Sequence, residues 1–279
     1  MICSVRDATV RFGSRTALDR VSMDVTPGQV SAVVGGDGAG KSTLLRAIVG
    51  EVVLTSGNIE APAEEKIGYL PASAGSWLDL TVTENMEFVG GAYGLRGAEL
   101  HSRIDELLEA AGLQDARGRL SGQLSGGMRR KLGFCLAVIH DPLLLVLDEP
   151  STGVDPVSRV DLWRLISKAA AGGAGVIMST TYLDEAERSS ALLVLDSGVT
   201  VVQGTPDEAL ASLPGTLEAV ETPTRREWAW RRGRLFHEYW PEGAAPSEGA
   251  QPITPDLEDI VIAASLRRRA MAAAASASS

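Results

Sequence analysis

The order of apolar and polar positions predicts short strands that alternate with longer helices. The segment "CSVRDATVRF" (3–12) alternates well enough for a strand, and "ALDRVSMDVTPGQVSAVVG" (17–35) predicts two strands joined at a Pro-Gly turn. The apolar runs "LLLVL" (143–147) and "GVIMSTT" (175–181) predict buried strands. Shorter strands are predicted in "TSGNIEAP" and "EEKIGYLPA", and a hairpin in "ALLVLDSGVTVVQG".

Apolar residues recur at helical spacing between these strands. In "AELHSRIDELLEAAGL" they predict a helix that Gly112 ends, while Thr81 and Glu84 stand at capping-box spacing and predict a helix start. Ser125 is placed to cap another helix in "LSGGMRRKLGFCLAVIHDP". Further helices are predicted at residues 43–49 and 157–171 and in the short acidic "DEAER".

This alternation predicts an α/β fold with a parallel sheet covered on both faces, and ligands bind such sheets at the carboxyl ends of the strands. The mainly helical block at about 77–140 is expected to be a subdomain inserted into the sheet. We expect one domain over residues 1–212, an accessory extension over 213–268 and a disordered tail over 269–279, within the terminal "RRRAMAAAASASS".

One predicted strand runs into "GGDGAGKST", a complete match to G-x-x-x-x-G-K-[ST]. Glycines allow successive backbone N–H groups to point inward around an anion, and the following helix adds its positive N-terminal end. The lysine can reach the β- and γ-phosphates, and the serine hydroxyl can bind Mg²⁺. A flexible glycine turn would account for the glycines but not for Lys-Ser-Thr at this spacing. The predicted nucleotide-binding residues are Gly35, Gly36, Asp37, Gly38, Ala39, Gly40, Lys41, Ser42 and Thr43.

Composition narrows the class of protein. The 279 residues are 44% hydrophobic, which is ordinary for a globular protein, and the net charge of −10 argues against nucleic acid as a partner of the whole chain. No apolar run reaches the ~18–20 residues that span a bilayer, and the N-terminus lacks the form of a signal peptide, so we expect a cytoplasmic chain. Cys3 and Cys135 are expected to be small apolar residues in a reducing compartment.

The region beyond about residue 214 has a different character. It contains the basic and aromatic "RREWAWRRGRLFHEYW", a Pro/Gly/Glu-rich stretch and the helical "DLEDIVIAASL". The basic-aromatic stretch is compatible with a patch that binds nucleic acid or a membrane surface. A small accessory fold with a solvated basic face is the simpler interpretation, and we favour it.

A second group of motifs follows the P-loop. The strand in "LLLVLDEP" ends in Asp148, which can hold Mg²⁺, and Glu149, which can orient or deprotonate an attacking water. An apolar run that ends in Asp-Glu is weak evidence alone, but here it follows "LSGGM" and precedes "GVDP". P-loop, "LSGGM", Walker B and "GVDP" in this order resemble an ABC transporter ATP-binding subunit over residues 1–212, similar to exporters of the drug and ABC-2 type.

The resemblance implies a P-loop NTPase fold with a RecA-type core, an N-terminal antiparallel β subdomain and an inserted helical subdomain. It implies ATP and Mg²⁺ as ligands, with Ser42 and Asp148 on the metal, Glu149 as the catalytic residue, and Phe12 stacked on adenine. The signature of one subunit would meet the ATP of a second ATP-binding domain, in a head-to-tail pair beside an integral membrane permease at the inner face of the membrane. The signature residues are Leu124, Ser125, Gly126, Gly127 and Met128, and the D-loop residue is Asp155.

Two positions depart from the family pattern. Ala72 stands where the Q-loop glutamine is expected, and Thr181 stands where the switch histidine is expected. Loss of one preorganised polar group typically costs about 10²–10³ in rate, so we expect slow hydrolysis by the chain alone. The alternatives are a degenerate partner that regulates a second ABC ATPase and, less favoured, a soluble ABC ATPase in translation or DNA repair. Pairing with an identical or a different ATP-binding domain stays open.

Overall fold

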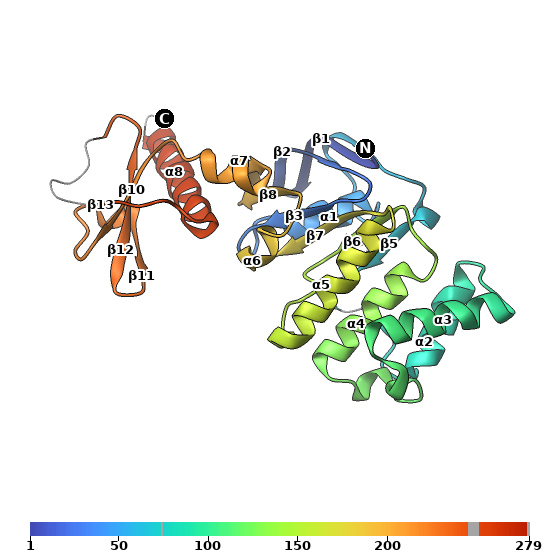
Figure 1. Ribbon diagram of the computed structural model, residues 1–279. Helices are drawn as coiled ribbons and strands as arrows, with labels where there is room; N and C mark the ends of the chain where they lie inside the picture. The colour runs from blue at the N-terminus through green and yellow to red at the C-terminus, as the bar shows by residue number, and fades with distance from the viewer. Residues whose placement is uncertain (74, 245–250, 278–279) are drawn as a thin grey trace.

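The computed structural model describes residues 1–73, 75–244 and 251–277, and a six-stranded sheet forms its centre (Figure 1). Five strands are parallel, and the last pairs antiparallel with its neighbour as the predicted hairpin. In spatial order the strands are β5 (Ile67–Leu70), β6 (Leu144–Leu147), β7 (Gly175–Thr180), β3 (Val30–Val34), β8 (Ala191–Asp196) and β9 (Val199–Gly204).

The central strands are buried along their whole length. Every residue of β3, β6 and β7 is buried, which agrees with the continuous apolar runs in their sequences. The helices α1 (Lys41–Ile48) and α5 (Pro156–Ala171) contact β7. This arrangement confirms the predicted α/β class, and it brings the ends of β5, β6, β7 and β3 to one edge of the sheet.

A smaller antiparallel sheet is formed by the N-terminal part of the chain, and β3 of the main sheet lies between its second and third strands in the sequence. It contains β1 (Cys3–Phe12), β2 (Arg15–Val25) and β4 (Ser56–Glu60), with β1 in the middle. Its apolar face shares a buried core with α1 and with one face of the main sheet. The prediction of an N-terminal antiparallel β subdomain is therefore confirmed.

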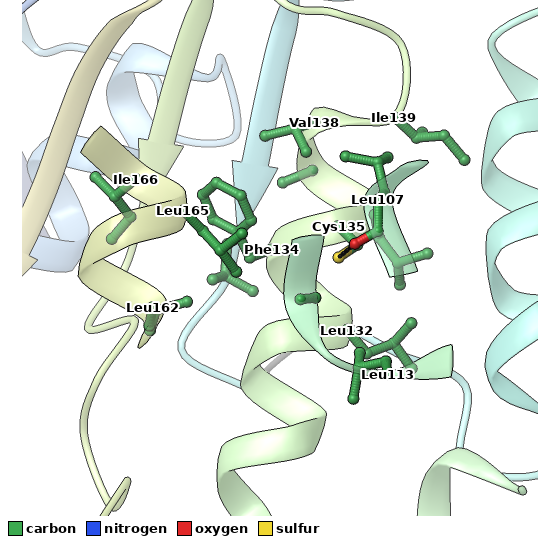
Figure 2. Close-up of a cluster of buried hydrophobic side chains, with 14 of the residues drawn as sticks. Leu107, Leu113, Leu132, Phe134, Cys135, Val138, Ile139, Leu162, Leu165 and Ile166 are labelled. Carbon is green, nitrogen blue, oxygen red and sulfur yellow. Dashed lines mark hydrogen bonds between the residues drawn. The ribbon is translucent and has the colours of Figure 1, made fainter. Parts of the chain in front are cut away.

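Three helices form the predicted helical block, and they lie apart from the small sheet in Figure 1. They are α2 (Val82–Ala92), α3 (Gly97–Ala111) and α4 (Gly126–Val138). Thr81 and Glu84 form the capping box, and Gly112 ends α3 in the left-handed conformation at φ 64°. Apolar side chains from α3, α4 and α5 pack in one buried cluster, so the subdomain is continuous with the sheet core (Figure 2).

Both cysteines are buried, as expected for small apolar residues. Burial raises the pKa of the Cys135 thiol to about 12, and burial with the nearby Asp24 charge raises the pKa of the Cys3 thiol to about 11. The Cys135 thiol donates to the carbonyl oxygen of Leu107 inside the cluster of Figure 2. Thiols held in the neutral form are poor nucleophiles, so both residues contribute packing.

The extension forms a small sheet that α8 covers, on the opposite side of the molecule from the helical block in Figure 1. Arg232 of the basic stretch pairs with Asp256 and Glu258 at the start of α8. Arg225 lies over the rings of Trp228 and Trp240. The elements from the main sheet onward are α6 (Leu183–Ala186), α7 (Pro206–Ala211), β10 (Gly215–Val220), β11 (Ala229–Arg232), β12 (Leu235–Pro241), β13 (Gln251–Pro252) and α8 (Leu257–Ala277).

Residues 269–277 of the predicted disordered tail lie in α8, which continues to Ala277, and the division into an extension and a tail stays a prediction. Alanine is the strongest helix former, and a helix already docked at Leu257 and Ile260 needs no new nucleus to extend. Residues 278–279 of the predicted tail lie outside the described residues, as do residues 245–250 of the predicted extension. The boundary between 212 and 213 stays a prediction. Short 3₁₀ turns occur at Glu64–Lys66, Gln114–Ala116, Ser121–Gln123 and Arg226–Trp228.

Candidate functional site

The strand order decides how the predicted site residues lie. Gly35 follows β3, Thr181 follows β7, Asp148 follows β6 and Ala72 lies two residues beyond β5. Because these strands are neighbours in the order β3-β7-β6-β5, Thr181 lies between the P-loop and the Walker B carboxylates. Ala72 lies on the far side of those carboxylates. The structure therefore brings both departures from the family pattern to the same edge as the phosphate-binding motif.

The P-loop needs glycine at two positions because the backbone passes close to other backbone. A Cβ on Gly35 would lie 2.4 Å from the carbonyl oxygen of Leu195. Gly40 has a φ of 109°, and a Cβ there would lie 2.7 Å from the carbonyl oxygen of Ala17. These contacts hold the loop against β2 and β8, so its shape exists before any ligand binds.

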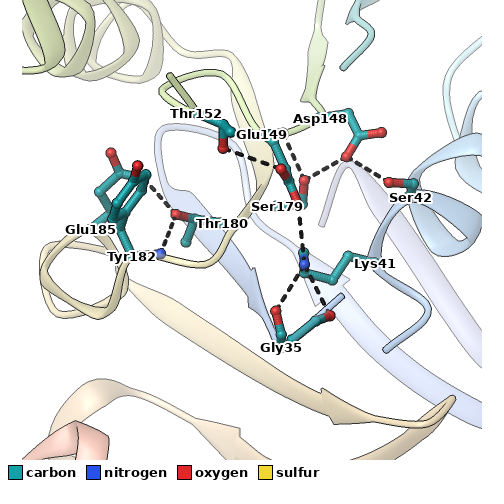
Figure 3. Close-up of polar contacts among 11 residues, drawn as sticks. Gly35, Lys41, Ser42, Asp148, Glu149, Thr152, Ser179, Thr180, Tyr182 and Glu185 are labelled. Carbon is teal, nitrogen blue, oxygen red and sulfur yellow. Dashed lines mark hydrogen bonds and ion pairs between the residues drawn. The ribbon is translucent and has the colours of Figure 1, made fainter. Parts of the chain in front are cut away.

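Lys41 is the best-connected cation of the site. Its side chain is 5% exposed, and its Nζ donates to the carbonyl oxygens of Gly35 at 2.8 Å and Gly36 at 3.2 Å (Figure 3). The same Nζ lies 3.1 Å from Oε1 of Glu149. Two oxygens of the loop and one of Glu149, which follows β6, hold this ammonium in position for a phosphate chain that enters the loop.

Asp148 is fixed from two directions. Its Oδ1 accepts hydrogen bonds from Ser42 Oγ at 3.0 Å and from Ser179 Oγ at 2.6 Å. Ser179 Oγ also accepts from the backbone N–H of Glu149 at 2.8 Å, and the N–H of Asp148 donates to Leu70. The contact between Ser42 and Asp148 joins the P-loop to Walker B, as the two predicted metal-binding residues require (Figure 3).

Sequence reasoning missed Ser179. It occupies the second-to-last position of β7, where a wholly buried strand carries a hydroxyl beside the next strand's carboxylates. A buried serine at the carboxyl end of a central strand was a signal that we did not use, because the neighbouring strand is known only from the structure.

Glu149 lies in an unusual backbone conformation. Its φ is 48°, in the left-handed region that non-glycine residues seldom adopt. The hydrogen bond to Ser179 holds its N–H, and Thr152 Oγ1 donates to its Oε2 at 3.1 Å. Backbone strain of this kind is often found where a structure holds a functional side chain in place.

A cavity of about 280 Å³ opens over the P-loop. Phe12, whose side chain would stack on adenine in the family, lines its rim and is 54% exposed. The donor set fits a nucleotide with its metal, since a lysine and a helix N-terminus face phosphate while serine and aspartate oxygens suit Mg²⁺. The cavity is lined by Phe12, Arg15, Ala17, Gly36, Asp37, Gly38, Ala39, Gly40, Lys41, Ser42, Thr43 and Glu149.

The signature lies outside this cavity, at the start of α4. Ser125 caps the helix by accepting from the N–H of Met128 at 3.3 Å, as predicted. Gly127 packs tightly against the start of α5, where a Cβ on it would lie 2.8 Å from Ser158 Oγ and 3.4 Å from Asp155 Oδ2. The signature and the D-loop are therefore in direct contact within one chain.

Asp155 caps α5 from the D-loop. Its Oδ1 accepts from the N–H groups of Ser158 at 3.0 Å and Val157 at 3.1 Å. These hydrogen bonds, the one to Ser158 first, hold the pKa of the Asp155 carboxyl below its usual value. The carboxylate is thus charged at neutral pH and complements the helix N-terminus.

At the position of the Q-loop glutamine, an arginine reaches across from the signature helix. Arg130 donates to the carbonyl oxygens of Pro71 at 3.2 Å and Ala72 at 2.5 Å. Burial lowers the pKa of Arg130, while the charges of Glu149 and Asp148 act in the opposite direction. Sequence reasoning missed this residue, because nothing local to "GGMRRK" shows which loop lies beside it.

Thr181 is exposed, and its two neighbours are held instead. Thr180 Oγ1 donates to Oε2 of Glu185 at 2.6 Å and accepts from the N–H of Tyr182 at 3.0 Å. Among the described residues, the Thr181 side chain has no hydrogen bond. The structure places a hydroxyl at the switch position but gives it no partner within the described chain.

Comparison with known proteins assigns the family. The profile described as ABC transporter matches residues 18–152. The Nod factor export ATP-binding protein I of Cupriavidus metallidurans is 34% identical over 222 residues, which are 76% of this chain and 73% of that protein. The fold and site define a P-loop ATPase of the ABC class. The chain belongs to the family of ABC transporter ATP-binding proteins.

Two further similarities agree with this assignment. The probable multidrug ABC transporter ATP-binding protein YbhF of Escherichia coli K12 is 34% identical over 219 residues, or 75% of this chain, which spans 38% of the length of YbhF. A solved structure of the ATP binding subunit of an ABC transporter has a TM-score of 0.70 at 28% identity and covers 76% of this chain and 92% of that chain. Proteins of this family bind ATP, and the relatives' names give no support to a regulatory partner without catalysis.

Proposed function

We propose that this chain binds and hydrolyses ATP to power an ABC-type exporter at the inner face of the membrane. The observation that carries the proposal is the junction of the P-loop with Walker B, through Ser42 to Asp148 and Lys41 to Glu149. Both contacts join residues far apart in the chain, and each brings together groups that phosphoryl transfer requires. The export role rests on the names of the relatives.

The ion pair between Lys41 and Glu149 sets the order of events. The terminal phosphates of an entering ATP compete for the Lys41 ammonium, so Glu149 is released toward the water that attacks the γ-phosphorus. The carboxylate accepts the proton of that water as the bond to the bridging oxygen breaks, which yields ADP and phosphate. Ser42 and Asp148 would hold Mg²⁺, which supplies neutralisation of the developing phosphate charge.

A second ATP-binding domain is needed to complete this chemistry. The cavity over the P-loop is open, and the signature of the same chain lies outside it. The N-terminus of α4, where Ser125 caps the N–H of Met128, does not line the cavity over the P-loop of its own chain, so we propose that it meets the phosphate bound by another chain. We propose a head-to-tail pair, and the exposed Thr181 favours a non-identical partner with a complete switch position.

The permease surface is proposed at the start of the helical block. Trp77, Leu78 and Phe88 are 47%, 52% and 56% exposed, so these apolar side chains do not belong to the buried core of the helical block. The Trp77 and Phe88 rings meet edge to face at 4.8 Å. None of the helices in the described part of the chain could span a bilayer. We propose that the chain docks on the permease through these exposed apolar side chains.

Purification of the tagged chain from its native membrane in mild detergent tests this function. We expect a co-purifying protein with several apolar segments of ~20 residues, and its yield should fall when Trp77 and Phe88 are changed to serine. Val53→Ser is the matched control, because Val53 is 86% exposed and lies outside the helical block. Recovery of the same membrane protein with all three forms would refute the docking surface, and recovery of no membrane protein would refute the export role.

A further inference from the structure

One arginine on α5 holds the loop in which Thr181 lies. We define the switch segment as residues 180–185. Arg159 donates from one terminal nitrogen to both carboxylate oxygens of Asp184, at 3.0 and 2.9 Å. Its guanidinium also lies 4.0 Å from the centre of the Tyr182 ring. A planar cation that pairs with a carboxylate and stacks on an aromatic ring fixes both the distance and the angle of the segment it holds.

The same guanidinium forms an ion pair with a second carboxylate, but this pair has no hydrogen bond. Arg159 Nε lies 3.4 Å from Oε1 of Glu185, whose side chain is 0% exposed. Both atoms are buried, and neither has a hydrogen-bond partner among the described residues. A buried donor and a buried acceptor that lack a hydrogen bond are costly, so a small approach of α5 to the switch segment, which would turn this ion pair into a hydrogen-bonded one, is favourable.

The other oxygen of Glu185 anchors the segment to the sheet. Glu185 Oε2 accepts from Thr180 Oγ1 at the end of β7, and Thr180 in turn accepts from the N–H of Tyr182 (Figure 3). The residues on both sides of Thr181 are therefore bound into one cluster with Arg159. A shift of Arg159 is transmitted to the position of Thr181 through contacts of 2.6–4.0 Å.

Closure on a second ATP-binding domain would displace the start of α5. Arg159 lies one turn beyond Asp155, the D-loop cap, and next to Ser158, against which Gly127 of the signature packs. Signature, D-loop, Arg159 and switch segment form a continuous path of direct contacts. Gly127 at one end of this path and Asp184 at the other are distant from α5 in the sequence, whereas Asp155, Ser158 and Arg159 lie within about one turn of its start.

We propose that Arg159 is the positioning residue that ties Thr181 to the signature and D-loop, so that closure on a second ATP-binding domain completes the contact between Arg159 and Glu185 and sets the switch segment. This inference rests on the proposed function. In this proposal α5 positions the switch segment through Arg159. The side chain of Thr181 itself has no hydrogen bond within the described chain.

Steady-state ATP hydrolysis by the full chain with its partner domain tests the positioning role of Arg159. In Arg159→Gln, kcat should fall about 10- to 100-fold, because misplacement far from the chemistry has effects of that size. The KM for ATP should stay within about twofold of wild type, since the P-loop is untouched. Arg164→Gln is the matched control on the same helix, where Arg164 is 76% exposed and pairs only with Asp161 among the described residues.

Two further variants protect the test against a folding defect. Arg159→Lys keeps the charge and loses the fork and the stacking, so kcat should still fall. Glu185→Gln should lower kcat, and the double variant should show no further loss, because both residues act through one contact. Wild-type kcat in Arg159→Lys and Arg159→Gln, or additive losses in the double variant, would overturn the proposal.

Hydrogen exchange separates this proposal from the proposed function, because it needs no turnover. Amides at 181–187 should exchange about tenfold faster in Arg159→Gln than in wild type or Arg164→Gln. If wild type does not hydrolyse ATP but this local increase is seen, the proposed function is refuted, whereas the positioning role of Arg159 is supported. Unchanged exchange at 181–187 would refute the positioning role of Arg159 even if the enzyme is active.

Discussion

The two halves of the site differ in how their polar groups are held. In the half that contains the P-loop and Walker B, Lys41, Ser42, Asp148 and Glu149 bind one another directly. In the half that contains the switch and Q-loop positions, Thr181 has no hydrogen bond among the described residues and Ala72 has no polar side chain. Arginines from neighbouring helices hold this half instead, since Arg130 donates to the backbone of Ala72 and Arg159 pairs with the side chain of Asp184.

We infer from this difference that the first half binds ATP and that the second half regulates the rate of hydrolysis. A preformed cradle binds phosphate with little rearrangement, since its donors are already placed. A loop placed by side chains of α4 and α5 depends on where those helices lie, and both helices begin at the surface where we propose that a second ATP-binding domain binds. We therefore expect substitutions in the first half to remove activity and substitutions in the second half to tune it.

The largest effect is expected at Lys41. Lys41→Ala removes the only side-chain cation within hydrogen-bond reach of Gly35 and Gly36 among the described residues, so ATP turnover should fall by about 10³-fold or more. Phosphate release by the purified chain measures it. Lys168→Ala, at an exposed lysine outside the P-loop, is the control. Equal turnover in wild type and Lys41→Ala would contradict the assignment of the site.

A slightly smaller loss is expected at Glu149. Glu149→Gln keeps the shape of the side chain and removes the group that accepts the proton, so kcat should fall about 10²–10³-fold while ATP still binds. The ATP-bound pair should then accumulate, seen as a mass shift in size-exclusion chromatography. Glu51→Gln, at a partly exposed surface carboxylate, controls for charge. A persistent monomer with ATP and the partner domain present would argue against head-to-tail closure.

Ser179 should give an intermediate effect, because it acts through Asp148 and through the backbone of Glu149. Ser179→Ala removes the 2.6 Å hydrogen bond to Asp148 and should lower activity about tenfold, with a higher Mg²⁺ requirement. A titration of activity against Mg²⁺ measures the shift. Ser190→Ala, at an exposed serine, is the control. An unchanged Mg²⁺ requirement would show that Ser42 alone suffices to orient Asp148.

The smallest effect is expected at Thr181, and it has the opposite sign. Thr181→His should raise the rate of the isolated chain about threefold to tenfold, since imidazole can donate to phosphate and carry charge. Addition of a second, non-identical ATP-binding domain should raise wild-type turnover more than that of the variant. Thr181→Val tests whether the hydroxyl contributes. Rapid hydrolysis by pure wild-type chain, unchanged by Thr181→His, would show that the departure is neutral.

The sequence by itself determined the class of fold and the phosphate-binding half. Glycines, a lysine and hydroxyls at fixed spacing form a local anion site, and the capping box at Thr81 and the cap at Ser125 act within one turn of helix. Hydrophobic periodicity placed the buried strands correctly for the same reason, since it reports which face of an element is buried. These features depend on residues that are close in the sequence, so they can be predicted without knowing which elements pack together.

Only the tertiary structure decided the rest. The roles of Ser179, Arg130 and Arg159 arise from strand order and helix packing, which bring residues 30 or more positions apart into contact in the first two cases and 25 apart in the third. The helical tail depends likewise on the docking of α8, which low-complexity composition does not show. Such contacts follow from long-range packing of the whole chain, and a single sequence carries no local signal for which loop lies beside which helix.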